Sequence, residues 1–404
     1  MRSNGPEIVV LPETPAPPIG IHNQVLLVLV LAGAAAVALL GFLGDAPNRL
    51  VSGRPVPLWI AAGFAPTTML AVLSAALLAA CFVRPSRLLH HAVALSAAGL
   101  LLLTLVAAGH SASTLASTAG PSTRISLGPA FWVLAACAAL AIADPLQRLR
   151  AGIIAQAMTV TTIAGGGVLL AALGTFDALS IVREYASHRQ VFADAVVRHL
   201  SLVGVSVGAA VAIGFPLGVA AARHPRLQGP VFATLNILQT IPSIALFGLL
   251  IVPLSALVAV VPQLGAFGVG GIGVTPAIIA LVLYALLPVV RNTSVGLTSV
   301  DSAVVEAGHG MGLSSGQIFW QVELPLALPV LLAGLRIVTV QAIGLAVVAA
   351  LIGAGGLGTF VFEGLGQYAV DLVLLGALPA IFLALGADFI LQILTTALRR
   401  RFAR

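Results

Sequence analysis

Long runs of apolar residues, separated by short polar segments, dominate this chain of 404 residues. A helix needs about 20 apolar residues to cross the hydrocarbon core of a bilayer. By that rule the pattern predicts roughly ten spans, at residues 25–44, 58–83, 92–109, 127–143, 152–174, 200–222, 230–252, 275–297, 326–350 and 370–398. No segment alternates apolar and polar positions as barrel strands do. The expected fold class is therefore all-α, a polytopic transmembrane helical bundle.

The polar segments divide the chain into three expected parts. Residues 1–24 are rich in proline and are expected to form a cytoplasmic disordered tail. Residues 25–179 form an N-terminal extension of five spans, and residues 180–404 form a second domain with five more. The polar stretch 180–200, at the start of the second domain, is expected to lie as an amphipathic helix on the outer surface. The run 254–262 is too short to cross and is expected to be re-entrant or interfacial.

Composition supports a lipid environment and limits the partners. The chain is 59% hydrophobic and 8% charged, whereas soluble domains carry about 25% charged residues. All 19 basic residues are arginines, and they are scattered with few aromatics, so no nucleic-acid partner is expected. With both termini in the cytoplasm, twelve arginines lie inside and six outside, which agrees with the positive-inside rule. We expect a multi-pass protein of a bacterial inner membrane.

The longest cytoplasmic loop in this topology, residues 300–325, has the pattern of a docking element. A short apolar-periodic helix is interrupted by three glycines, which permit a tight turn. A second helical pattern then runs over residues 318–324, and Pro325 is expected to end it at the base of the next span. Such a rigid helix-turn-helix can fit a groove in a partner protein.

The spacing in this loop resembles the EAA loop of ABC importer permeases, whose pattern is Glu-Ala-Ala-x3-Gly-x9-Ile-x-Leu-Pro. The matching positions, with Gly308 for the second Ala and Val322 for Ile, are Glu306, Ala307, Gly308, Gly312, Val322, Glu323, Leu324 and Pro325. The resemblance implies a type I ABC importer permease core. It also implies an ATPase-coupling role for Glu306, Ala307, Gly308, Gly312, Glu323 and Pro325.

The flanking segments resemble one branch of that family, the permeases that import the osmoprotectants glycine betaine, choline and carnitine. They are residues 199–227, 235–250, 276–297 and 349–358. The resemblance covers about half of the chain, from about 195 to 360, and the five N-terminal spans resemble only the longer members. It implies an ABC ATPase subunit, a periplasmic or extracellular solute-binding protein and a second permease copy as partners, in addition to membrane lipid.

The residues argue against catalysis within this chain. A P-loop needs a lysine to reach the β- and γ-phosphates, and this sequence has none, so ATP is expected on a partner subunit and no cofactor here. No His or Cys has the spaced partners of a metal site, and a GxGxxG at 353–358 follows no strand. A membrane-embedded enzyme would need paired acidic or His residues at a membrane face, and the sequence shows no such pair. Two alternatives stay open: a permease for another small polar solute, and an ATP-independent secondary transporter.

Polar side chains at bilayer depth are costly and therefore candidates for function. In the seventh span, where Pro242 breaks the helical ladder, we expect a translocation path lined by Asn236, Gln239, Thr240 and Ser243, with Tyr284 from the next span. The alternative is a hydrogen-bond seam between helices.

Two charged residues lie deep within the last two spans. Arg336 and Asp388 are each about ten residues from the cytoplasmic end of a span, which places both roughly 15 Å deep. Equal depth predicts an intramembrane ion pair, because a lone charge there would be costly. The alternative for Arg336 is that it caps backbone carbonyls.

Overall fold

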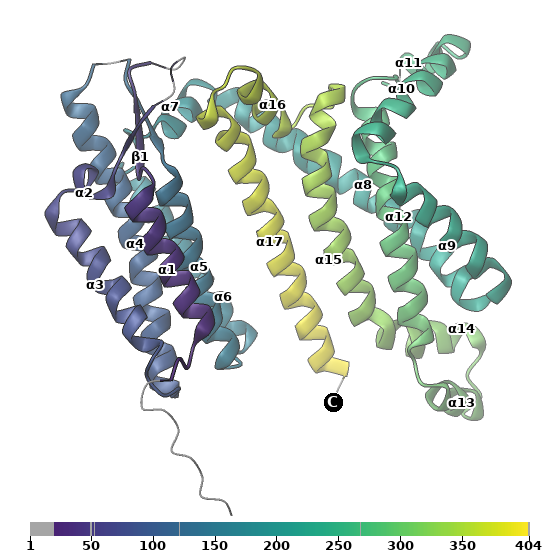
Figure 1. Cartoon of the computed structure of the whole chain (residues 1–404). Coiled ribbons are helices and arrows are strands. Elements are labelled where there is room, and N and C mark those ends of the chain that lie inside the picture. The colour runs from purple at the N-terminus through teal and green to yellow at the C-terminus, as the bar shows by residue number, and fades with distance from the viewer. Residues whose placement is uncertain (1–19, 49–50, 52, 121, 267, 403–404) are drawn as a thin grey trace, which may run out of the picture. The chain divides into compact units, whose positions relative to one another are not determined.

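The computed structural model describes residues 20–48, 51, 53–120, 122–266 and 268–402, and most of these lie in helices (Figure 1). Contacts divide the chain into two compact units, Met1–Leu179 and Ser180–Arg404. Eight of the described helices are long and apolar enough to cross a membrane. Two shorter apolar helices, Gln24–Leu39 and Phe64–Ala80, accompany them. The predicted transmembrane helical bundle is confirmed, and its count of about ten spans is approximate.

The first unit is a helical bundle with a small sheet at one end. Its helices are α1 (Gln24–Leu39), α2 (Leu58–Ala61), α3 (Phe64–Ala80), α4 (Arg87–Thr118), α5 (Pro129–Arg148) and α6 (Ile153–Ala172). The helix α5 packs along both α1 and α4, and α3 packs along α4. The helix α4 is much longer than the predicted span 92–109, because its hydrogen-bonded ladder continues through the polar residues after 109.

The sheet was not predicted. Its antiparallel strands β1 (Leu43–Ala46), β2 (Arg54–Val56) and β3 (Arg124–Leu127) are ordered β2-β1-β3. In the register, Leu43 lies opposite Val56 on one side and Leu127 on the other. A side chain at Gly128 would lie 2.3 Å from the Gly41 carbonyl oxygen, so glycine is required for this close approach.

The second unit is built around the helix α12. Its elements are α7 (Ser180–Ser187), α8 (Arg189–Arg223), α9 (Pro225–Thr240), α10 (Ser243–Val260), α11 (Gln263–Ala266), α12 (Val274–Thr298), α13 (Ser302–Gly310), α14 (Ser315–Ile318), η1 (Phe319–Glu323), α15 (Leu324–Val348), η2 (Ala349–Ile352), α16 (Gly358–Gly366) and α17 (Val370–Phe402). The helix α12 packs against α8, α9, α10 and α15, and α15 packs against α17.

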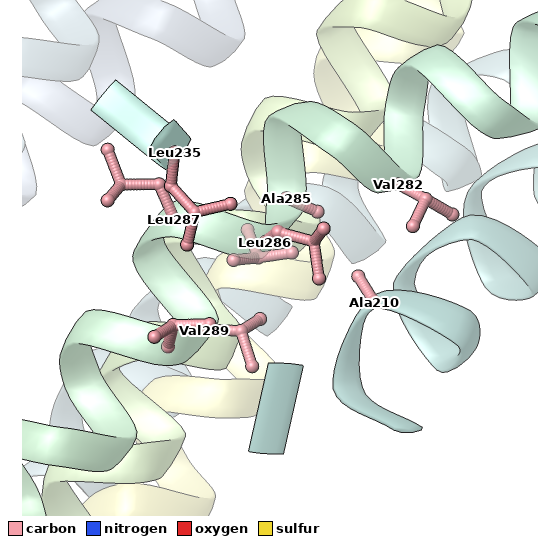
Figure 2. Close-up of a cluster of buried hydrophobic side chains, with 9 residues drawn as sticks. Ala210, Leu235, Val282, Ala285, Leu286, Leu287 and Val289 are labelled. Carbon is pink, nitrogen blue, oxygen red and sulfur yellow. The ribbon is translucent and has the colours of Figure 1, made fainter. Parts of the chain in front are cut away.

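Small and branched residues bring these helices close together. Figure 2 shows Leu235 of α9 and Ala210 of α8 directed at α12, where Leu287 and Leu286 lie in the same buried cluster. A side chain added at Gly218 of α8 would lie 2.5 Å from Cβ of Thr293. Such close helix approach is how transmembrane helices gain packing energy where lipid is as apolar as the core.

Two predictions near α10 were wrong. The expected span 230–252 is not one helix, because α9 ends at Thr240 and α10 begins at Ser243. The run 254–262 is not a separate re-entrant piece, because α10 continues through Pro253 to Val260. Pro242 thus shifts the spanning segment toward the C-terminus, so that α10 alone is long enough to cross.

One prediction about a polar segment also needs correction, and another falls mostly outside the described residues. The stretch 180–200 is not one amphipathic helix: it breaks at His188 into α7 and the first turns of α8. Of the expected disordered tail, residues 1–19 lie outside the described residues. The backbone N–H groups of His22 and Asn23 donate to the Cys81 carbonyl at 2.8 and 3.3 Å, so the last residues of that tail are held in place.

Candidate functional site

The loop between α12 and α15 folds as a helix-turn-helix, as its glycines predict. Asp301 caps α13, its carboxylate accepting the Ala303 N–H at 2.9 Å. At the other end, Gly312 has φ +82°. Its N–H donates to the His309 carbonyl at 2.9 Å, and the Leu313 N–H donates to the Gly308 carbonyl at 3.1 Å. These two bonds form a Schellman motif, which closes α13 and requires a left-handed residue at position 312.

The second arm begins with a capping box. The Ser314 N–H donates to Gln317 Oε1 at 2.8 Å, and the Ser314 hydroxyl accepts the Gln317 N–H at 3.4 Å. From there one continuous helix runs from Ser315 to Ile352, through α14, η1, α15 and η2. The second arm is therefore directly continuous with a membrane span.

Pro325 does not end this helix, contrary to prediction. The five residues before it, Phe319–Glu323, form the π-helical turn η1, in which the Leu324 N–H donates to the Phe319 carbonyl. A proline removes one helical N–H and its ring crowds the carbonyl four residues earlier. The wider π-turn changes the hydrogen-bond spacing at that point, so the helix passes through the proline.

The two arms close on each other at Gly308. A methyl group there would lie 3.3 Å from Cγ1 of Ile318 and 3.7 Å from Cδ1 of Leu313. Ile318 itself is buried. Only a residue as small as glycine or alanine lets the second arm lie this close to the first, which gives a physical reason for the small residue in this position.

An ion pair holds the base of the second arm to the end of α8. The Arg223 guanidinium donates from Nη2 to Oε2 of Glu323. The Glu323 side chain is 7% exposed, and the Arg223 side chain is 47% exposed. Arg223 also lies 6.0 Å from the ring centroid of Phe319. An open groove of about 380 Å³ runs along this junction, with Val305 and His309 of α13 on its other side.

Three large apolar side chains of the helix-turn-helix are exposed, one on each arm and one at the turn. Val304, Met311 and Trp320 are 43%, 75% and 64% exposed. Glu306 and Ala307 are exposed on α13. Exposed large apolar groups next to polar ones, on a rigid support, are typical of protein interaction sites.

Gln239 and Tyr284 form a hydrogen-bonded lock between the end of α9 and α12. Gln239 Nε2 donates to the Tyr284 carbonyl at 2.8 Å, and the Tyr284 hydroxyl donates to the Ile241 carbonyl. Tyr284 is 7% exposed, within a buried cluster. Gln239 and Tyr284 therefore have the geometry of the alternative, a seam between helices.

The remaining residues of the predicted path are not joined to that lock. The Thr240 hydroxyl donates to the Ile237 carbonyl of its own helix at 2.7 Å. Asn236 is exposed on α9, and Ser243 is the first residue of α10. Their lining of a translocation path stays a prediction.

Arg336 of α15 and Asp388 of α17 meet head to head. Nε of Arg336 donates to Oδ1 of Asp388, and Nη2 donates to Oδ2 at 2.6 Å. The side chains are 38% and 32% exposed. The carboxylate, rather than backbone carbonyls, is thus the partner of Arg336. This two-bond arrangement fixes the rotation of the two helices about each other as well as their separation.

The sequence analysis did not identify the partners of two residues predicted to couple to the ATPase, Glu323 and Gly308. Arg223 was counted only as a charge that sets topology, although it holds Glu323. Ile318 and Leu313 were not singled out, although they pack on Gly308. Their spacing after the glycine, at apolar positions flanking a capping Ser314, was the available signal. Among the described residues no three His, Cys, Asp or Glu side chains gather as a metal site would need.

The comparisons with known proteins cover both units. Residues 22–182 match the N-terminal domain of the ABC transporter permease YehY. Residues 214–404 match the binding-protein-dependent transport system inner membrane component family. A likeness was also found to a solved inward-facing structure of the MetNI methionine ABC transporter, at 25% identity, covering 52% of this chain and 98% of that chain, with a TM-score of 0.45.

Two curated relatives are each similar to about half of the chain. The osmoprotectant import permease protein OsmW of Salmonella typhimurium is 44% identical over 201 residues, which is 50% of this chain and 88% of that protein. The carnitine transport permease protein OpuCB of Listeria monocytogenes is 42% identical over 192 residues, 48% of this chain and 80% of that protein.

Proposed function

Because this chain belongs to the family of osmoprotectant ABC importer permeases, we propose that it moves glycine betaine, choline or carnitine through the inner membrane, driven by a separate ATPase. Its relatives include an osmoprotectant import permease and a carnitine transport permease. A permease for another small polar solute is the closest alternative. The chain is the membrane subunit of the importer, and its own residues transmit force and form the path.

The helix-turn-helix at 302–323 is the observation that carries this proposal. Its exposed apolar side chains, Val304, Met311 and Trp320, are suited to fill a groove on a soluble partner. The Schellman turn and the capping box fix the angle between its arms. Docking of the ATPase on this element would therefore act on a rigid body rather than on a flexible loop.

Two connections then carry a movement of this element into the bundle. The second arm is continuous with α15, and Glu323 is tied to Arg223 at the end of α8. A push on this element is therefore passed to α15 and to the end of α8 together. Because α15 is paired to α17 through Arg336 and Asp388, α17 moves with it. Rigid-body movement of this kind is a recurrent route to alternating access.

The proposed ATPase and binding-protein partners would supply two features that this sequence lacks, a P-loop lysine and an aromatic cage. With no lysine, it has no P-loop of its own, so ATP is bound by the partner ATPase. Quaternary ammonium solutes are recognised by aromatic cages, and only 5% of these residues are aromatic. We place the selective cage on an extracytoplasmic binding protein, and we take two copies of this permease, with two ATPases, as the simplest assembly.

Reconstitution tests the proposal directly. The permease, its ATPase and its binding protein are placed in proteoliposomes, and uptake of labelled betaine, choline, carnitine and an amino acid is measured with ATP inside. Uptake of a quaternary ammonium solute that stops when the ATPase loses its P-loop lysine supports the proposal. Uptake that survives that change would identify a secondary transporter, and saturable uptake of only the amino acid would reject the osmolyte assignment.

A further inference from the structure

The end of the first unit where α4 begins and α5 ends contains a basic hollow. It has a volume of about 340 Å³ and lies between the α3–α4 and α5–α6 connections. Its polar lining is Ser86, Arg87, His90, Arg148 and Arg150. No motif in the sequence points to this hollow, and it lies outside the permease core.

The charge of the hollow is only partly compensated. Asp144 accepts from Nε of Arg148 at 2.9 and 3.0 Å and from Nδ2 of Asn23 at 2.7 Å. Arg148 also donates from Nη2 to Oδ1 of Asn23 at 3.0 Å. This network neutralises Arg148 and fixes its position. Within the described ranges, Arg87 and Arg150 form no ion pair, so two positive charges remain.

The other polar groups of the hollow are also arranged for an anion. His90 Nδ1 lies 2.6 Å from the Ser86 carbonyl oxygen. Because a carbonyl only accepts, Nδ1 carries the proton there and Nε2 is the ring atom left for a further partner. The hollow adjoins the N-terminus of the 32-residue helix α4, which is capped by Ser86, and the positive end of the helix dipole adds to the local potential.

We propose that this hollow binds a phosphate-bearing anion. The planar guanidinium group of arginine matches the geometry of phosphate oxygens. Arg87 and Arg150 line the hollow without an ion-pair partner among the described residues, and together they suit one tetrahedral phosphate group. Basic pockets between transmembrane helices on the cytoplasmic side hold the headgroups of anionic lipids. The same chemistry serves a lipid phosphodiester or free phosphate, and the first unit would then bind such a group independently of solute transport.

The test uses the full chain and compares the two sources of phosphate. In one arm the purified protein is titrated with phosphatidylglycerol in phosphatidylcholine nanodiscs, and bound lipid is counted by native mass spectrometry. In the other arm inorganic phosphate is titrated in detergent, and the melting midpoint is followed. Saturation in the first arm alone identifies a lipid headgroup, and saturation in the second identifies free phosphate.

The variants decide whether the binding is in the hollow. Arg87→Gln and Arg150→Gln should each weaken binding roughly tenfold, because each removes a charge-assisted contact. Arg84 lies in the α3–α4 connection, close to Arg87 in sequence, but does not line the hollow. Arg84→Gln removes the same charge, so phosphate or lipid binding by this variant should stay within about twofold of wild type. Equal loss in all three variants, or no saturation in either arm, would overturn the proposal. If one variant fails to fold, the other carries the comparison.

Discussion

Replacing Arg223 by Gln removes the cation that faces the buried carboxylate of Glu323. Exposed ion pairs are worth about 0.2–1 kcal/mol, whereas removing one partner of a buried pair costs about 3–5 kcal/mol. The side chains here are 47% and 7% exposed, which places the cost between these limits, at about 2 kcal/mol. That corresponds to roughly a thirtyfold shift in the equilibrium between the anchored and the released second arm.

Substitution of the other partner, Glu323, should have a smaller effect. Glu323→Gln leaves a guanidinium that is already half exposed and can turn to water, and the glutamine oxygen still accepts from Arg223. The expected cost is about 0.5–1 kcal/mol, a few-fold shift. In the double variant no buried charge is left without a partner, so it should recover part of the loss caused by Arg223→Gln.

The assay is the ratio of solute taken up to ATP hydrolysed in the same reconstituted vesicles. We expect Arg223→Gln to lower this ratio strongly, Glu323→Gln to lower it slightly, and the double variant to lie between them. Arg226→Gln is the matched control, because Arg226 is exposed at the start of α9. Equal losses from the two single variants, or a double variant that simply adds them, would refute the buried-carboxylate reasoning.

Three further substitutions probe the turn, the lock and the intramembrane pair. Gly312→Val forces a branched residue into φ +82°, should cost about 1–2 kcal/mol and should lower uptake, whereas Gly310→Ala, with open space around it, should leave uptake unchanged. Tyr284→Phe removes the donor to the Ile241 carbonyl and should lower the free energy of unfolding in detergent by about 1 kcal/mol. Arg336→Met should lower it by about 3 kcal/mol, and adding Asp388→Leu should restore most of that; a double variant as unstable as the single one would contradict the ion pair's role.

The sequence predicted the spans better than their ends. The length of an apolar run follows the thickness of the hydrocarbon core. Apolar runs therefore predicted a transmembrane bundle and the approximate number of its spans. They could not show that α4 continues to Thr118, since backbone hydrogen bonding does not depend on hydropathy. The three strands at the end of the first unit have only three or four residues each, which is too short for an alternating pattern to appear.

Two prolines show why tertiary contacts limit such predictions. Both Pro242 and Pro325 were expected to interrupt a helix, and only Pro242 does. The break at Pro242 leaves the Ile241 carbonyl without a helical partner, and the Tyr284 hydroxyl donates a hydrogen bond to it. At Pro325 the preceding π-turn keeps the helix continuous. Nothing in the local sequence distinguishes these two outcomes.

The Arg336–Asp388 and Arg223–Glu323 ion pairs differ in the same way. Arg336 and Asp388 could be paired from sequence because both lie at one depth in the last two predicted spans. Arg223 and Glu323 are 100 residues apart, and each had another explanation, as a topology charge and as a motif position. Only the packing of α8 against the π-turn brings them together.

The central claim is that residues 302–323 lie on the inner side of the membrane and receive the ATPase. Ala307→Cys, in a chain whose Cys81 and Cys137 are replaced by Ala, gives one exposed thiol on that element. Labelling with a membrane-impermeant maleimide is compared in inside-out and right-side-out vesicles, with and without the ATPase subunit. We predict labelling only in inside-out vesicles, and protection of the thiol when the ATPase is present. Labelling from the outer side, or equal labelling with the ATPase bound, would contradict the central claim.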